Sequence, residues 1–182
     1  YLARLAEQQN VNLEFEASVG GGIPILRAIK DGLATNKFKK VFGILNGTTN
    51  YILTEMENKN ENFSNVLKKA QILGYAEPGN PKLDLNGFDA LAKVRILSSL
   101  AFKNKITSQN CIMEGIENIE LKDIKIANQL GLRIKLIGIS EMINNQLFEA
   151  VHPCLVSKRS YIGNVNGVMN AVILEGKPIG EN

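Results

Sequence analysis

The chain has 182 residues, of which 45% are hydrophobic and 21% are charged, a composition that is ordinary for a globular protein with a substantial core. Its 21 basic and 18 acidic residues are interleaved, which argues against the clustered basic surface of a nucleic-acid-binding protein. No apolar run approaches the length of a membrane span, and no signal peptide is visible. From the charge pattern we expect no nucleic acid as partner, and from the lack of a long apolar run we expect no membrane.

The two cysteines indicate the redox compartment. Cys111 and Cys154 lie far apart in the chain and form no CxxC motif. Reduced thiols in a cytoplasmic protein are the simplest interpretation, and a disulfide between them would be the alternative, although their spacing does not support one. The sequence begins inside an apparent helix and ends on a loop, so we expect it to be a piece of a longer protein.

The first half of the chain alternates helical and strand patterns. Pro24 suits the first turn of a helix, where its missing N–H costs nothing, and Ser64 and Gly74 are typical first and last residues of another. In chain order, the patterns predict a helix over 2–10, a strand over 12–19, a helix over 23–34, a strand over 38–45, and helices over 48–56 and 64–73.

The second half predicts the longest helix and an antiparallel strand pair. Asn144 and Asn145 separate two strand patterns and are suited to a tight turn. The predicted elements are a helix over 85–102, a short helix over 121–130, paired strands over 132–143 and 146–156, and a last strand within 168–176. This order favours an α+β fold, with one mixed β-sheet covered by helices on one side.

The longest predicted helix carries two charges among apolar residues. Asp89 and Lys93 are one helical turn apart and would share the helix face of Leu85, Ala92, Ile96, Leu97 and Leu100. An exposed pair at this spacing is common and contributes only about 0.3–0.5 kcal/mol. Burying two charges among apolar groups costs several kcal/mol unless they are paired, so a functional role is the better explanation. A lysine beside carboxylates in such a setting suits proton transfer.

Two further carboxylates precede this helix. Glu77 and Asp84 lie on a loop rich in Gly and Pro, close to the positive N-terminal end of the helix. Carboxylates that converge there could bind an ammonium group or a hydroxyl of a substrate. The alternative is a solvated loop whose acidic residues merely favour the helix end.

The same stretch resembles the fingerprint of the homoserine dehydrogenase family. It reads Ala70-x3-Gly74-Tyr75-Ala76-x3-Asn80-Pro81-x2-Asp84-Leu85-x-Gly87-x-Asp89-x3-Lys93. Some members have an Asp-Pro pair one residue nearer the glutamate, whereas here Gly79 lengthens the loop and Asn80 replaces that aspartate. Segments 16–26, 43–53, 151–156 and 164–172 are also similar to stretches of the family, so the resemblance spans most of the chain.

The resemblance implies an NAD- or NADP-dependent oxidoreductase that interconverts L-homoserine and L-aspartate 4-semialdehyde, in the biosynthesis of threonine, methionine and isoleucine. It would be a cytoplasmic homodimer that associates through its sheet. By the same resemblance, Lys93 would be the catalytic acid and base that moves the hydroxyl proton. The substrate would be held by Glu77, Asp89, Asp84, Tyr75, Gly47 and Thr48, and the cofactor would meet Gly74 and Glu77.

The resemblance also implies a cation site. The family's strand-to-helix turn binds a monovalent cation, usually sodium, through backbone carbonyls that match those of Glu16, Val19, Gly21 and Ile23. The three consecutive glycines of this turn are not a G-x-G-x-x-G motif, and on their own they are a weak signal for a dinucleotide.

The implied domain organisation is incomplete. No full dinucleotide-binding βαβ unit lies in this sequence. By resemblance, residues 1–10 would be the terminal helix of a nucleotide-binding domain or a linker, residues 11–176 the catalytic and dimerisation domain, and residues 177–182 the start of a segment that returns to the nucleotide-binding domain. The piece on its own should be weakly active or inactive.

Two other functions fit parts of the sequence. A non-catalytic module that binds an amino acid or assembles subunits would explain the missing dinucleotide unit. A dehydrogenase of a related semialdehyde would need a cysteine nucleophile, and neither cysteine has an activating base nearby in sequence. The single histidine, His152, has no partners at triad or zinc spacing, so we expect a structural role for it.

Overall fold

The computed structural model describes residues 2–103, 111–178 and 180–181 of the chain, and it contains one six-stranded sheet in the order β2-β4-β3-β1-β5-β6. β2 runs parallel to β4 and the other neighbouring strands are antiparallel, so the sheet is mixed. The strands are β1 (Lys37–Ile44), β2 (Cys111–Met113), β3 (Leu132–Ile143), β4 (Gln146–Ser157), β5 (Ala171–Lys177) and β6 (Gly180–Glu181).

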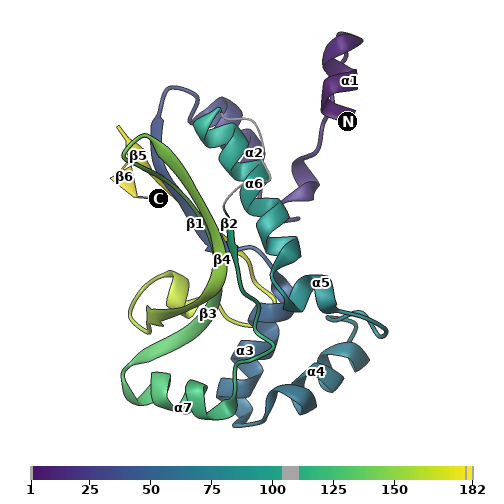
Figure 1. Cartoon of the computed structure of the whole chain (residues 1–182), viewed down its shortest axis with the longest axis vertical. Helices are drawn as coiled ribbons and strands as arrows, with labels where there is room; N and C mark the ends of the chain where they lie inside the picture. Colours follow the sequence, from purple (N-terminus) through teal and green to yellow (C-terminus); the bar gives the residue numbers. More distant parts are fainter. Residues whose placement is uncertain (1, 104–110, 179, 182) are drawn as a thin grey trace.

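Apart from α1, which stands away from the sheet, the α-helices lie beside one face of the sheet and beyond its end, as Figure 1 shows, which confirms the predicted α+β fold. The α-helices are α1 (Leu2–Gln8), α2 (Ile25–Arg27), α3 (Gly47–Lys59), α4 (Phe63–Ile72), α5 (Lys82–Leu85), α6 (Phe88–Phe102) and α7 (Leu121–Gln129). Short 3₁₀ turns occur at η1 (Glu16–Ser18) and η3 (Ile162–Asn164), and a π-type turn, η2 (Ala28–Gly32), continues α2. No helix among the described residues is long and apolar enough to cross a membrane.

The β3–β4 hairpin forms where the sequence predicts it. Asn144 and Asn145 both have positive φ angles, of 49° and 63°, which two-residue hairpin turns require and asparagine tolerates. The two strands pair in continuous register from Leu132 opposite Ser157 to Ile143 opposite Gln146. β1 then pairs with β3 on one side and β5 on the other, so strands distant in sequence form the centre of the sheet.

The strand predicted over residues 12–19 is wrong. This segment is irregular up to Phe15 and then forms η1, and it lies outside the sheet, whose centre is occupied by β1 with β3 and β5 on either side. Instead, the carboxylate of Glu16 accepts hydrogen bonds from the backbone N–H groups of Leu26 (2.8 Å) and Arg27 (2.9 Å). The segment therefore stabilises the start of α2 rather than extending the sheet.

Two predicted helix starts also differ from the structure. α4 has Asn62 rather than Ser64 as its N-cap, and the Asn62 side chain accepts a hydrogen bond from the Asn65 N–H. The helix predicted from Leu85 is interrupted at Gly87, whose φ of 86° is accessible mainly to glycine, so α6 starts at Phe88.

The buried side of α6 is not the predicted one. Its buried residues are Ala90, Leu91, Val94, Leu97 and Ser98, whereas Ala92 is exposed and Asp89 and Lys93 are only partly buried. α6 is apolar nearly all round, so its sequence pattern does not decide which side faces the sheet. The sheet decides it, because Gly138 leaves space there: a Cβ on Gly138 would stand 2.4 Å from a methyl carbon of Val94.

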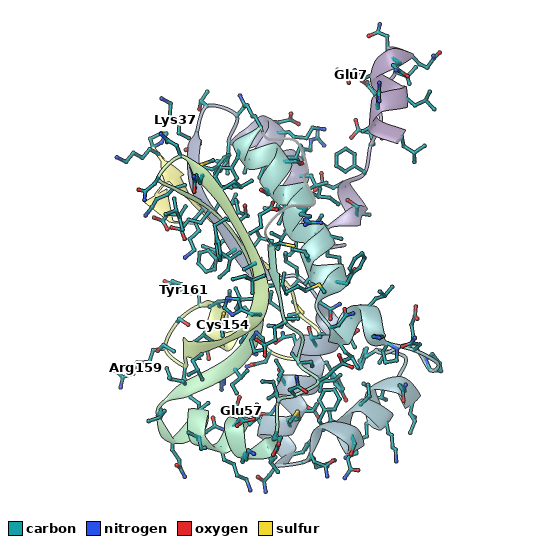
Figure 2. All side chains as sticks on the ribbon, viewed as in Figure 1. Glu7, Lys37, Glu57, Cys154, Arg159 and Tyr161 are labelled. Atoms are coloured by element: carbon teal, nitrogen blue, oxygen red, sulfur yellow. The ribbon has the colours of Figure 1, made fainter. Side chains whose placement is uncertain are left out.

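The two faces of the sheet carry different cores. The larger core lies between the sheet and the helices and includes Val41 and Val151. Successive strand residues point to opposite faces, so Phe42 belongs to the other face, where Ile44, Ile137 and Ile162 form a smaller cluster. Cys154, labelled in Figure 2, packs against this smaller cluster, on the side where the loop with Arg159 and Tyr161 follows β4.

The junction between α5 and α6 generates a stability prediction. A Cβ on Gly115 would stand 1.9 Å from the backbone oxygen of Leu85, and the neighbouring Ile116 N–H donates to that same oxygen. Gly115→Ala must therefore push the junction away, and we expect a loss of about 3 kcal/mol in the free energy of unfolding, measured by urea denaturation.

The matched control is Gly32→Ala, because Gly32 ends a helical turn and has open space where its Cβ would stand. This variant should change the free energy of unfolding by no more than about 0.5 kcal/mol. Equal stability of the two variants would show that the close packing of Gly115 against Leu85 does not constrain the junction.

Candidate active site

Two hollows meet at the junction of α5 and α6. One, of about 360 Å³, is lined by Asn46, Gly47, Thr48, Gly74, Tyr75, Asp84, Asp89, Lys93 and Val168. The other, of about 290 Å³, is lined by Glu77, Asn80, Pro81, Leu83, Asp84, Phe88, Asp89 and Ala92. Asp84 and Asp89 line both, so these carboxylates stand between the two hollows. Every residue that the sequence assigns to substrate, cofactor or proton transfer lines one of them.

Lys93 is held by two acceptors from different parts of the chain. Its ammonium nitrogen lies 2.7 Å from Asp89 Oδ2, one turn earlier on α6, and 3.1 Å from the backbone oxygen of Leu45, just after β1. An ammonium group has three N–H donors, so one remains after these two bonds. This third donor could reach a bound molecule in the hollow that Lys93 lines.

The Asp89–Lys93 pair is partly buried. The side chains are 32% and 24% exposed, so the pair is neither the freely solvated surface pair nor the fully buried pair that the sequence analysis weighed. They lie at the border of the buried side of α6, because that side is centred on Leu91 and Val94. This position gives both charges access to the hollow while Leu45 and Asp89 restrict the lysine to one direction.

Asn46 is the central residue that the sequence analysis missed. Its amide nitrogen donates to Asp84 Oδ1 (2.8 Å) and Asp89 Oδ2 (3.0 Å), and its amide oxygen accepts from the N–H and the hydroxyl of Thr49 (both 2.9 Å). Asn46 is thus the N-cap of α3 and the bridge between two carboxylates. The capping role could have been found in the sequence, because asparagine is a preferred residue directly before a helix. The bridge could not, because it depends on a contact with Asp89, 43 positions later in the chain.

The first turns of α3 also contact the loop after α4. The hydroxyl of Thr48 donates to the backbone oxygen of Tyr75 (2.6 Å), and the Tyr75 ring lies 4.8 Å, centroid to centroid, from that of Tyr51 on α3. Burial raises the pKa of Tyr51 above its usual range, and the nearby carboxylate of Glu55 adds to the rise. Tyr51 therefore stays neutral and serves as a packing partner for Tyr75.

Gly74 and Glu77 lie where the site is open. Gly74 has a φ of 77° and no atom stands within 4 Å of the position of a Cβ, so a flat ring could approach its backbone closely. Glu77 is exposed, and its backbone oxygen accepts a hydrogen bond from the Gln71 side chain (3.1 Å), which holds the loop against α4.

The predicted cation turn lies apart from these hollows. The backbone oxygen of Glu16 accepts from Val19 N–H (3.4 Å) and that of Ile23 from Ile25 N–H (2.7 Å), so two of the four predicted carbonyl ligands already take part in turns. Each carbonyl oxygen keeps a second lone pair for an ion. Within residues 2–103, 111–178 and 180–181, no group of three or more His, Cys, Asp or Glu side chains is placed to hold a metal ion.

Neither cysteine lines the two hollows. Cys111 Sγ lies 3.1 Å from the guanidinium of Arg95, and Cys154 Sγ lies 3.4 Å from His152 Nδ1 on the other face of the sheet. Burial raises the pKa of the Cys154 thiol, which disfavours the reactive thiolate.

Comparison with known proteins gives one consistent family. The family model for homoserine dehydrogenase matches residues 24–182. A homoserine dehydrogenase of Neisseria gonorrhoeae is 47% identical over 177 residues, which are 97% of this chain and 40% of that protein. The chain therefore spans about 40% of the length of this curated relative.

Solved structures similar to this chain are of the same family. A homoserine dehydrogenase from Thiobacillus denitrificans is 42% identical with a TM-score of 0.95, over 100% of this chain and 42% of that one. A hyperthermophilic archaeal homoserine dehydrogenase mutant, in complex with NADPH, is 24% identical with a TM-score of 0.81, over 100% of this chain and 51% of that one, and at this identity it shares the fold.

The double role of Asn46 generates a prediction. Asn46→Ala removes both the cap of α3 and the donors between Asp84 and Asp89, so we expect a loss of about 2–3 kcal/mol in the free energy of unfolding. Asn62→Ala is the matched control, because Asn62 caps α4 in the same way and its side chain accepts from Ser64 and Asn65, with no hydrogen bond to a carboxylate of the described residues. It should lose about 1 kcal/mol in the same urea titration. Equal losses would mean that the bridge contributes nothing to stability.

Proposed function

The chain belongs to the homoserine dehydrogenase family, and from this premise we propose that the protein interconverts L-homoserine and L-aspartate 4-semialdehyde with NAD or NADP. In this proposal it serves the biosynthesis of threonine, methionine and isoleucine in the cytoplasm. The observation that carries the proposal is the Lys93–Asp89 pair, held at the border of a hollow by Leu45 and Asn46.

Lys93 would move the proton of the reacting hydroxyl. In the oxidation of homoserine, the hydroxyl O–H bond breaks as the carbonyl forms, and the proton passes to the neutral amine of Lys93. In the reduction of the semialdehyde, the same N–H returns the proton to the carbonyl oxygen. Asp89 and the Leu45 carbonyl orient the nitrogen, so its remaining position points to the substrate. The nicotinamide, when bound, supplies or accepts the hydride.

The carboxylates would hold the amino end of the substrate. Asp84 and Asp89 share the donor Asn46, and Glu77 lines the adjoining hollow with both. Three carboxylates around one space attract an ammonium group, and homoserine carries one. Gly47, Thr48 and Tyr75 would form the remaining substrate surface, because they line the hollow that also contains Lys93.

The cofactor would approach from the open side of the site. Gly74 and Glu77 are exposed, and the lack of a side chain on Gly74 leaves room for the nicotinamide ring. The residues present therefore fit the edge of a dinucleotide site, while the rest of that site would belong to a domain outside this sequence.

The carbonyls of Glu16, Val19, Gly21 and Ile23 would hold a sodium ion. Hard oxygen ligands suit a monovalent cation, and Gly21 has open space around its Cβ position, so no side chain blocks an ion there. The ion would stiffen the turn before α2 and take no part in proton transfer.

The chain would contribute one domain to a homodimer. Residues 11–176 would be the catalytic and dimerisation domain, and residues 177–182 the start of a return segment. α1 within residues 1–10 stands away from the sheet in Figure 1, as expected for a helix of another domain or a linker. The sheet face opposite α6 carries the partly exposed apolar side chains of Phe42, Ile139 and Ile173, which would pack against a second copy.

The two rival functions are less well supported. A non-catalytic binding module would not need a lysine restricted to one direction at the border of a hollow. A semialdehyde dehydrogenase that forms a thioester would need a cysteine beside the substrate, and both cysteines lie outside the two hollows.

The assignment of Lys93 is tested in the full-length enzyme. Lys93→Ala should lower kcat for homoserine oxidation by about 10²–10⁴-fold, because it removes the proton acceptor. Lys82→Ala is the control: Lys82 is the exposed first residue of α5 and lines neither hollow, so the kcat of this variant should stay within about twofold of wild type. Turnover of Lys93→Ala near the wild-type rate would contradict the assignment.

A further inference from the structure

Lys135 is a buried lysine for which the proposed reaction has no use. It lies in β3, is 2% exposed, and forms no ion pair with any described carboxylate. Its ammonium nitrogen donates instead to three neutral oxygens: Asn50 Oδ1 (2.9 Å), the Val165 carbonyl (2.7 Å) and Asn166 Oδ1 (3.1 Å). All three of its N–H donors are therefore used.

Asn50 lies in α3, and the other two acceptors lie in an irregular stretch, the 165–169 segment. Asn50 joins the two, since its amide nitrogen donates to the carbonyls of Val165 (3.1 Å) and Met169 (3.0 Å). A third link runs from the Gly167 N–H to the hydroxyl of Thr54 on α3 (3.1 Å). The segment thus takes its shape mainly from bonds to Lys135 and α3, because it contains no helix or strand.

The 165–169 segment forms part of the candidate active site. Val168 lines the hollow that contains Asp89 and Lys93, and the residue is exposed. Its carbonyl oxygen packs against the backbone of Gly47: a Cβ on Gly47 would stand 2.8 Å from it. A shift of the segment would therefore move one wall of the hollow and press on the start of α3, where Asn46 and Thr48 lie.

Keeping a charged group at this position is costly. The pKa of Lys135 is lowered to about 8, chiefly by burial and also by the nearby Arg133, while Glu57 on α3 acts in the opposite direction. A buried apolar side chain of similar size would avoid this cost, so stability alone does not explain a lysine here. Unlike methionine, a lysine can donate hydrogen bonds to three oxygens and so hold them in place. Here two of the three oxygens belong to the 165–169 segment.

We propose that Lys135 and Asn50 are positioning residues, which hold the 165–169 segment in the conformation that places Val168 at the wall of the active-site hollow and thereby set the affinity for the substrate. Neither side chain lines the hollow, so they act through the segment. This inference rests on the proposed function, because the substrate whose affinity it concerns is homoserine.

The test compares variants of the full-length enzyme by kinetics and by amide hydrogen exchange. In Lys135→Met, the KM for homoserine should rise about tenfold while kcat changes by less than about threefold, because proton transfer by Lys93 is untouched. Exchange in the peptide that covers residues 164–170 should accelerate by about tenfold or more, while the β3–β4 hairpin stays protected.

Ser140→Ala is the matched control. Ser140 is also fully buried in β3, and its hydroxyl bonds that of Ser98 on α6 (2.8 Å), away from the 165–169 segment. This variant loses a buried hydrogen bond, yet KM and exchange of the segment should stay at wild-type values. If it raised KM as much as Lys135→Met does, the effect would be general destabilisation and the inference would be wrong.

Asn50→Asp keeps the proposal testable if Lys135→Met fails to fold. It retains an acceptor for Lys135 but removes both amide donors to the segment, so KM and exchange should change in the same direction. Unchanged KM in the folded variants, with or without faster exchange, would overturn the inference. A wild-type enzyme that does not oxidise homoserine would instead contradict the proposed function, which separates the two failures.

Discussion

The amide side chain of Asn46 is the interaction on which the geometry of the site depends. It caps α3 and donates to carboxylates of α5 and α6, so one side chain fixes three elements against one another. Without a donor between them, Asp84 and Asp89 would repel each other and could not share one space. With it, both carboxylates stay available to an ammonium group, and Asp89 can also hold Lys93.

The sheet supplies the rigid support for this arrangement. β1 is a central strand, paired on both sides, and the Leu45 carbonyl that binds Lys93 follows it directly. α6 approaches the sheet closely at Gly138, and Gly115 packs against the junction before α6, so the helix that carries Asp89 and Lys93 has little freedom to shift. The loop of Glu77 and the 165–169 segment lie beside this centre and have exposed residues, among them Glu77 and Val168.

Local chemistry predicted several parts of this protein. Asn144-Asn145 indicated a tight turn because few other residues accept two positive φ angles. The motif from Gly74 to Lys93 resembles a known family, and the residues that it singles out line the two hollows of the candidate site, although their roles stay predictions. The remainder depended on neighbours distant in sequence. Residues 12–19 alternate like a strand but lie outside the sheet and cap the start of α2. α6 is too apolar for its pattern to orient it, and the roles of Asn46 and Lys135 arise from contacts that only the fold creates.

The most direct test of the account is a crystal structure of the full-length enzyme with homoserine and a nicotinamide cofactor. The account predicts the substrate hydroxyl within about 3 Å of Lys93 Nζ and the substrate amino group in contact with Glu77, Asp84 or Asp89. It would be contradicted if homoserine bound elsewhere, for example in the apolar hollow between α7 and β4 that Ile126 and Leu155 line, or if Lys93 pointed away from the bound substrate.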